Sequence, residues 1–200
     1  EYTIAKKEAW LAELGNKNYP PSLVDQRIKA ALKGEKNWVL IGGPPCQAFS
    51  LAGRSRVGGV HEEDHRVFLY KEYLRIIAKH QPAVFVMENV KGLLSARLNG
   101  EKIFSWILRD LKNPSSVFIN TNHTKYKVYS LVKSDIQRDK DYLIKAEEYG
   151  IPQKRHRVIL LGIREDLSVT PQILIKKEKI TVAIEEKRDR LEEIRHGLIE

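Results

Sequence analysis

The feature that most constrains this chain is a short apolar run, Val39–Ile41, that ends abruptly in Gly42–Pro45 and is followed by Cys46, the only cysteine in 200 residues. Aliphatic residues without alternation are typical of a short strand buried on both faces, and two glycines followed by two prolines stop helices and central strands. We therefore expect Cys46 in a loop at the carboxyl end of a strand, where α/β sheets bind ligands. A single cysteine is more often a small buried hydrophobe, but the constrained backbone around this one favours a reactive role.

The composition fits one globular domain with a polyanionic partner. The chain is 42% hydrophobic, and 35 Lys and Arg against 26 Asp and Glu give a formal charge of +9. One cysteine excludes an intramolecular disulfide framework and a multi-cysteine metal site, and it fits a reducing compartment. Since no apolar run is long enough to span a bilayer and the N-terminus does not resemble a signal peptide, we expect a cytoplasmic protein without a membrane partner.

The spacing of apolar residues predicts alternating helices and strands. Helices are expected over 4–14, 23–32, 67–80, 101–111, 141–149 and 181–200, and strands over 38–41, 83–87, 117–119, 126–132 and 157–163. Strand, helix and strand around 67–80 form a βαβ unit, which predicts two parallel strands. Because the second of these strands ends at Glu88, that carboxyl group would share the sheet edge with Cys46.

Two basic segments supply further candidates. Residues 51–65 combine glycines with Arg54 and Arg56, which predicts either a lid that closes over nucleic acid or an ordinary exposed loop. Two histidines in this loop flank acidic residues, but no ligand spacing recurs elsewhere, so we expect no metal site.

Arg155 and Arg157 stand two residues apart at the start of the strand predicted over 157–163. If this strand runs antiparallel to the two earlier ones, it begins at the edge where they end, and both side chains point to one side. They would then enter the site of Cys46 and Glu88. Otherwise they form a solvated basic patch.

A thiolate, a carboxyl group and one or two guanidinium groups at one edge suit addition to an electrophilic carbon with protonation of a conjugated nitrogen. Cytosine is such a substrate, because its carbon 5 accepts a methyl group only after a thiolate adds to carbon 6 while a carboxyl group serves N3. Cys46 and Glu88 are the candidates for these roles, with Arg157 or Arg155 at O2. The base must first leave the duplex, which fits a basic surface and a glycine-hinged loop.

Three segments resemble, in order, motifs of the DNA cytosine-C5 methyltransferases. They are Gly43–Ser50, Glu88–Val90 and Gly150–Arg157, the last resembling the family's Gln-x-Arg-x-Arg motif. The resemblance covers about residues 37 to 164. It implies an α/β fold with a Rossmann-like, S-adenosylmethionine-dependent methyltransferase sheet, mostly parallel with an antiparallel strand near its C-terminal part.

The resemblance also implies roles for individual residues. Cys46 would be the nucleophile, Glu88 would meet N3 and the exocyclic N4, Arg157 would meet O2, and Arg155 would be a supporting contact. The remaining candidates are Gln47, Ser50, Arg54 and Arg56 at the DNA, Asn89 mainly orienting its neighbours there, and Pro44 and Pro45 at the cofactor, S-adenosylmethionine.

The chain departs from the family at both ends. Only 36 residues precede the predicted Cys46 strand and they contain no G-x-G element, and no room of ~100 residues for a base-reading domain follows the last strand. We therefore expect an incomplete sheet. The chain would divide into a helical lead-in (1–36), a catalytic core (37–164) and a charged helical tail (165–200). The chain would be a fragment, a split subunit or a sequence with missing segments. A complementary polypeptide or those segments would carry the cofactor loop and the base-reading domain, and the isolated chain would be inactive.

The leading hypothesis is methyl transfer from S-adenosylmethionine to carbon 5 of cytosine in double-stranded DNA, in a restriction-modification system. An RNA cytosine-C5 methyltransferase is disfavoured, because such relatives carry a further cysteine and this chain has none. A catalytically inactive nucleic-acid-binding or subunit module is the alternative from a different class.

Overall fold

The computed structural model describes residues 2–44, 69–98, 100–118 and 124–177. The helices are α1 (Tyr2–Glu8), α2 (Pro21–Leu32), α4 (Leu69–His80) and α5 (Ile103–Lys112). The strands are β1 (Val39–Gly42), β2 (Val84–Val90), β3 (Arg97–Leu98), β4 (Glu101–Lys102), β5 (Tyr126–Tyr129), β6 (Leu143–Lys145) and β7 (His156–Arg164). Short 3-10 turns cover Lys91–Ser95, Pro114–Ser116, Asp139–Tyr142, Ala146–Tyr149 and Glu165–Leu167.

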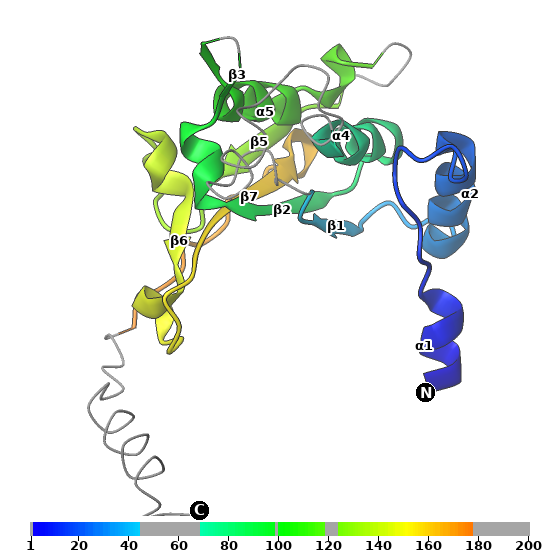
Figure 1. The fold of residues 1–200 in the computed structure, drawn as a ribbon, viewed down its shortest axis with the longest axis horizontal. Helices are drawn as coiled ribbons and strands as arrows, with labels where there is room; N and C mark the ends of the chain where they lie inside the picture. Colours follow the sequence, from blue (N-terminus) through cyan, green and yellow to red (C-terminus); the bar gives the residue numbers. More distant parts are fainter. Residues whose placement is uncertain (1, 45–68, 99, 119–123, 178–200) are drawn as a thin grey trace, which may run out of the picture.

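The main sheet has the order β1-β2-β7-β5, and β6 also pairs with β7 (Figure 1). β1 and β2 are parallel neighbours, as the βαβ pattern predicts, and β7 runs antiparallel to β2, β5 and β6. The described sheet is therefore mixed, and β1 with β2 is its one parallel pair. The expected antiparallel strand is β7. Because β7 lies between β2 and β5 in the sheet, the pairings on both its sides are antiparallel.

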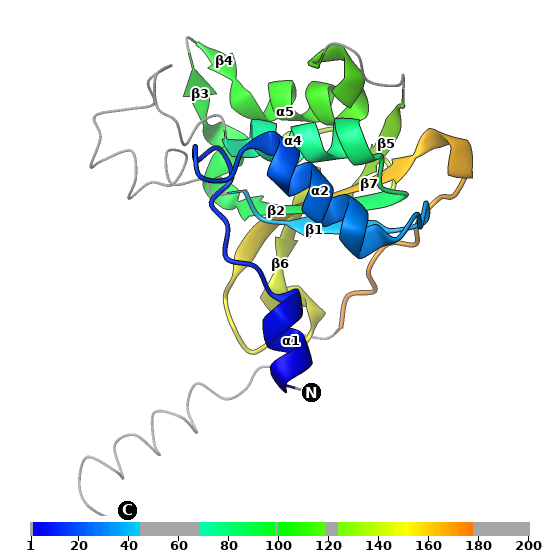
Figure 2. The same ribbon diagram turned by 90° about the vertical axis from the view of Figure 1, so that its right-hand side faces the viewer.

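The hydrophobic core lies between the sheet and two helices, α4 and α5, which cover one face (Figures 1 and 2). Alternate residues of β2 point into this core, since Phe85 and Met87 are buried while their neighbours are partly exposed. The fully buried large side chains are Leu74, Ile77, Phe85, Met87, Leu93, Ile103, Phe104, Ile107, Leu111, Tyr126 and Leu160. This packing fixes the position of β2 and β7, whose ends form the site described below.

A polar cluster joins α2 to α4. Oδ1 of Asp25 lies 2.8 Å from Nη1 of Arg75 and 2.8 Å from Nε2 of His80. Burial raises the pKa of the Asp25 carboxyl, but hydrogen bonds from Arg75 and His80 lower it by more in sum, so its pKa lies below the usual value. By contrast, α1 buries none of its residues and extends away from the sheet (Figures 1 and 2).

Several predicted elements differ from the structure. The first helix ends at Glu8, short of residue 14, because it has no buried face to extend. The helix expected over 141–149 is a turn, strand β6 and a second turn, since pairing with β7 outweighs local propensity there. Residues 117 and 118 form no strand, and β5 ends at Tyr129.

The strand β1 also differs, because it is not buried on both faces. Val39 is 54% exposed and Ile41 is 76% exposed. Of the predicted helical tail, residues 165–177 contain one 3-10 turn followed by irregular chain, and the rest lies outside the described residues. None of the described helices is long and apolar enough to cross a membrane.

Candidate active site at the ends of β1, β2 and β7

Three segments meet at one edge of the sheet. Parallel pairing aligns Gly42, the last residue of β1, with Met87 of β2. Antiparallel pairing sets Val90, the last residue of β2, opposite Arg157 near the start of β7. The strand β7 therefore runs antiparallel to the two earlier strands and begins at the edge where they end, which is the arrangement that would bring Arg157 into the site.

Glu88 and Arg157 form the central contact of this edge. Oε1 of Glu88 lies 2.6 Å from Nε of Arg157, with the two side chains 42% and 27% exposed. Nε is not aligned to donate a hydrogen bond, and Nη1 of Arg157 donates to the carbonyl of His156 at 2.9 Å. The pair is thus a close charge contact at a half-open edge, where ion pairs are weak enough to open.

Gly43 lies close to the Glu88 side of this contact. A Cβ built on Gly43 would lie 3.1 Å from Oε2 of Glu88, and one on Gly42 would lie 2.7 Å from the Tyr73 ring. The sequence suggested these glycines only as a stop signal. The structure adds that any side chain at Gly43 would crowd the carboxylate, a requirement that only the three-dimensional contact reveals.

Asn89 ties the end of β2 to the segment after β1. Its side chain is nearly enclosed, with 3% of the residue exposed. Nδ2 donates to the carbonyl of Pro44 at 3.3 Å, and Oδ1 accepts from the amide of Val90 at 2.8 Å. Asn89 therefore holds the backbone that leads toward Cys46, in keeping with its expected orienting role, and a contact with DNA stays a prediction.

The strand start next to Arg157 is held by a second pair. Nε2 of His156 lies 2.7 Å from Oε1 of Glu147, and this hydrogen bond lowers the pKa of the Glu147 carboxyl. The exposed Arg155 precedes β7, and its carbonyl accepts from Ala146 at 2.9 Å. Within the described residues, no contact joins the Arg155 side chain to Glu88 or Arg157.

Most other predicted site residues lie outside the described residues: Pro45, Cys46, Gln47, Ser50, Arg54 and Arg56. The predicted lid, 51–65, lies outside them as well. Pro44 is described and half-buried, and its carbonyl accepts from Asn89. In the parts of the chain that the structure describes, no three His, Cys, Asp or Glu side chains are grouped to bind a metal ion.

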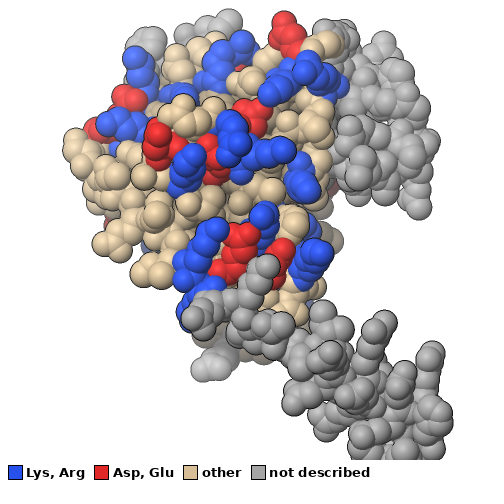
Figure 3. Space-filling model, turned by 90° about the vertical axis from the view of Figure 1, so that its left-hand side faces the viewer, with Lys and Arg blue, Asp and Glu red and all other residues tan. Residues whose placement is uncertain are grey.

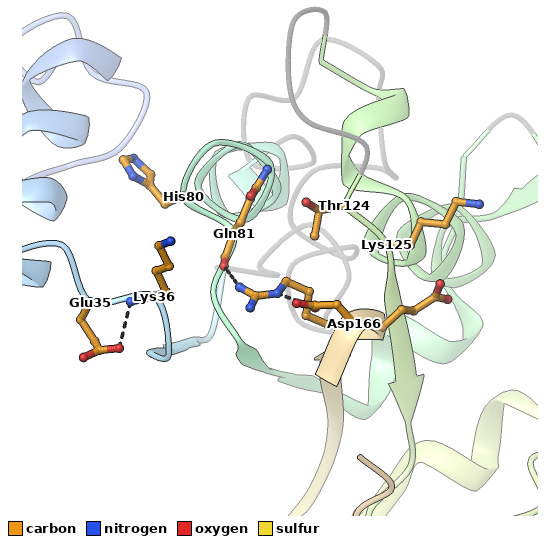
Figure 4. Close-up of a pocket in the computed structure, with 9 residues that line it drawn as sticks. Glu35, Lys36, His80, Gln81, Thr124, Lys125 and Asp166 are labelled. Carbon is orange, nitrogen blue, oxygen red and sulfur yellow. Dashed lines mark hydrogen bonds and ion pairs between the residues drawn. The ribbon is translucent and has the colours of Figure 1, made fainter. Parts of the chain in front are cut away.

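A cavity of about 640 Å³ lies at the opposite edge of the sheet (Figure 4). Its charges are mixed, and Arg164 is already engaged, since Nε lies 2.7 Å from Oδ1 of Asp166 and Nη1 donates to the carbonyl of Gln81 at 2.8 Å. This cavity is remote from Glu88, because it lies where β2 begins and β7 ends. It is therefore not part of the candidate site.

Comparisons with known proteins identify the family of this chain. A family model described as C-5 cytosine-specific DNA methylase matches residues 7–197. Type II methyltransferase M.FnuDI of Fusobacterium nucleatum is 34% identical over 86% of this chain and 44% of its own length. DNA (cytosine-5-)-methyltransferase M.ApeKI of Aeropyrum pernix is 34% identical over 68% and 29%.

Type II methyltransferase M.Bpa9945I of Bacillus paralicheniformis is 35% identical over 65% of this chain and 26% of its own length. The chain thus spans less than half the length of these relatives. The family model nevertheless covers nearly all of it, including the segments of Cys46, Glu88 and Arg157. The chain belongs to the C-5 cytosine-specific DNA methylase family.

Proposed function

We propose that this chain carries the catalytic residues of a DNA cytosine-C5 methyltransferase from a restriction-modification system. One observation carries the proposal: Glu88 and Arg157 lie in contact at the sheet edge, directly beside the Gly43–Pro44 segment that precedes Cys46. A carboxyl group and a guanidinium beside a cysteine loop are the groups that addition to a cytosine ring needs. The names of the relatives support the same reaction class.

The chemistry follows from these groups. The thiolate of Cys46 bonds to carbon 6 of a cytosine that has left the duplex, and the ring electrons shift toward N3, where Glu88, after taking up a proton from solvent, gives that proton. Arg157 holds O2, where negative charge also gathers. Carbon 5 is now enamine-like, so it can take up an electrophile, and water then accepts the hydrogen that carbon 5 carried. The N3 proton returns to Glu88, and the thiolate leaves carbon 6 as the aromatic ring is restored.

The Glu88–Arg157 contact has to open for this reaction. While the two side chains are paired, the carboxylate faces the guanidinium and not a base. An entering cytosine edge would separate them, with N3 and N4 toward Glu88 and O2 toward Arg157. The half-exposed position of the pair keeps the cost of this exchange small, about 1 kcal/mol or less.

The methyl donor, S-adenosylmethionine, would supply an electrophilic methyl group. The described residues do not by themselves fit it, because α1 and α2 precede β1 with no described strand and glycine-rich loop between them. Binding of the donor would therefore fall to a further segment or a complementary polypeptide. Because β1 is the outermost strand of the described sheet, its outer backbone edge can pair with a further strand, and its exposed Val39 and Ile41 show that one face is uncovered; both support a Rossmann-like sheet that continues beyond this strand.

The test separates the ring chemistry from the donor. Thiolate addition at carbon 6 lets the hydrogen at carbon 5 exchange with water, so duplex DNA tritiated at carbon 5 should lose its label with this chain alone. Adding S-adenosylmethionine, a polypeptide that binds this donor and a duplex containing 5-fluorocytosine should yield a covalent adduct on a denaturing gel. Cys46→Ser should abolish both signals, and failure of both with the intact chain would overturn the proposal.

A further inference from the structure

A groove of about 900 Å³ opens beside the candidate site. Val90 and Arg157 line its inner end, so it begins where β2 and β7 meet. Its walls come from the turn after β2, the turn before β6 and β6 itself. Figure 3 looks onto the side of the molecule where β3 and β6 lie, and Lys and Arg gather there among fewer Asp and Glu.

Positive charge dominates the lining of this groove. Among the described residues that line it, Asp139 is the one acidic residue, against Lys91, Lys102, Arg138, Lys140, Lys145 and Arg157. Part of this charge is compensated, since Lys102 lies 2.8 Å from Asp139 and Lys145 lies 2.9 Å from Glu148.

Two lysines of the groove have no such compensating charge. The exposed Lys91 and Lys140 form no ion pair with any described residue. They stand on different walls, one on the turn after β2 and one on the turn before β6. The half-buried apolar side chains of Val90, Leu94 and Leu143 line the same groove. Two lysines without an ion pair to a described residue, in a groove that also has apolar lining, suit a ligand that is both anionic and partly apolar.

We propose that this basic groove binds the sugar-phosphate backbone of DNA next to the extruded base, with Lys91 and Lys140 each holding a phosphate. Deoxyribose rings would lie on Val90 and Leu94. The inference rests on the proposed function, because the groove is continuous with the Glu88–Arg157 contact. These DNA contacts would be separate from those expected of the predicted lid, residues 51–65. Phosphate contacts of this kind fix the register of the duplex without reading its sequence.

Salt dependence of binding tests the groove. We would measure the affinity of the full chain for a fluorescein-labelled duplex between about 50 and 200 mM salt and compare slopes of log K against log salt. The double variant Lys91→Gln with Lys140→Gln should lower the slope by about 2, because each lost phosphate contact removes about one unit. The charge-matched control is Lys125→Gln with Lys127→Gln, two exposed lysines at β5 outside the groove, and it should leave the slope unchanged.

The outcomes separate the groove from the reaction. Equal slopes for the two double variants, or a native chain that does not bind the duplex, would overturn the groove. A lower slope for the groove variant alone supports phosphate binding at the groove. If no variant and not even the native chain exchanges hydrogen at carbon 5 of cytosine, that result counts against the proposed reaction only. Unchanged circular dichroism and thermal unfolding of the groove variant verify that both lysines act at the surface.

Discussion

Arg157 reaches Glu88 diagonally across two antiparallel strands, with Nε of the arginine 2.6 Å from Oε1 of the glutamate. The register sets Arg157 opposite Val90, two residues beyond Glu88, so both side chains leave the same face of the sheet. That face is not the one covered by α4 and α5. The two groups are therefore held by rigid strands while their charged ends stay open to a ligand.

Replacing Glu88 by Gln tests the acid. Glutamine has nearly the same shape but cannot deliver a proton to N3, so exchange at carbon 5 of cytosine should slow by about 10² to 10⁴-fold. The fold should be unaffected because the side chain is 42% exposed. The matched control is Glu165→Gln, an exposed carboxylate at the far edge, which should keep the native rate. Native exchange by Glu88→Gln, measured as tritium release, would remove Glu88 from the reaction.

Asn89→Asp isolates one hydrogen bond. Aspartate can still accept from the amide of Val90 but no longer donates to the carbonyl of Pro44. We expect a loss of about 1 to 3 kcal/mol in the free energy of unfolding, since a charge replaces a buried amide and one acceptor loses its donor.

The same variant should slow exchange at carbon 5 without changing the salt slope of DNA binding. That split distinguishes a residue that positions the loop before Cys46 from one that touches DNA. A flatter slope for Asn89→Asp would favour direct DNA contact instead.

The sequence predicted the parts of the fold that strong local patterns specify. β2, α4, α5 and β7 lie within a few residues of the expected ranges, because their apolar periodicity coincides with the buried core. The meeting of Glu88 with Arg157 was also predictable, since it needs only strand directions. The prediction of a helix over 141–149 was wrong, but its expected end was right. Gly150 ends the 3-10 turn Ala146–Tyr149 with a φ of 79°, a backbone conformation that favours glycine.

Other features depended on contacts that are distant in the sequence. β6 forms because the first residues of β7 pair with it, and nothing within 141–149 indicates this partner. The crowding at Gly43 depends on a carboxylate 45 residues away in the chain. Likewise, the basic groove joins Lys91 to Lys140, two lysines without a shared motif. Charge counts indicated a polyanionic partner, but only the fold showed that Lys91 and Lys140 of the groove form no ion pair with a described residue.

Gly162→Ala should destabilise the sheet by overpacking. Gly162 of β7 lies opposite Phe85 of β2, and a Cβ on Gly162 would clash with the buried Phe85 ring. Overpacking in a core of this kind costs about 1 to 3 kcal/mol. Adding Phe85→Leu to Gly162→Ala should restore part of the loss in urea unfolding, because the smaller side chain leaves room for the methyl group. Strictly additive losses would show that the two positions are not coupled.

Asp141 gives the fold a pH dependence whose sign can be stated. Oδ2 accepts from the amides of Gln137 and Arg138, each at 2.9 Å, and lies 3.5 Å from Nζ of Lys133. The hydrogen bond from Gln137 lowers the pKa of the Asp141 carboxyl most. Burial raises it, but the amide of Arg138 and the charge of Lys133 lower it further, so the net shift is downward.

Because the folded-state pKa of Asp141 lies below the unfolded value of about 3.9, its contribution to stability is complete above that pH and is lost as pH falls through the folded pKa. Asp141→Asn should therefore reduce the free energy of unfolding near neutral pH, and the gap to the native protein should narrow below about pH 4. Asp135→Asn, an exposed carboxylate in the same segment, is the control. Since Asp141 holds the turn that carries Arg138 and Lys140, the variant should also weaken DNA binding at the basic groove. A gap that stays constant with pH in urea unfolding would mean that the carboxylate charge contributes nothing to holding this turn.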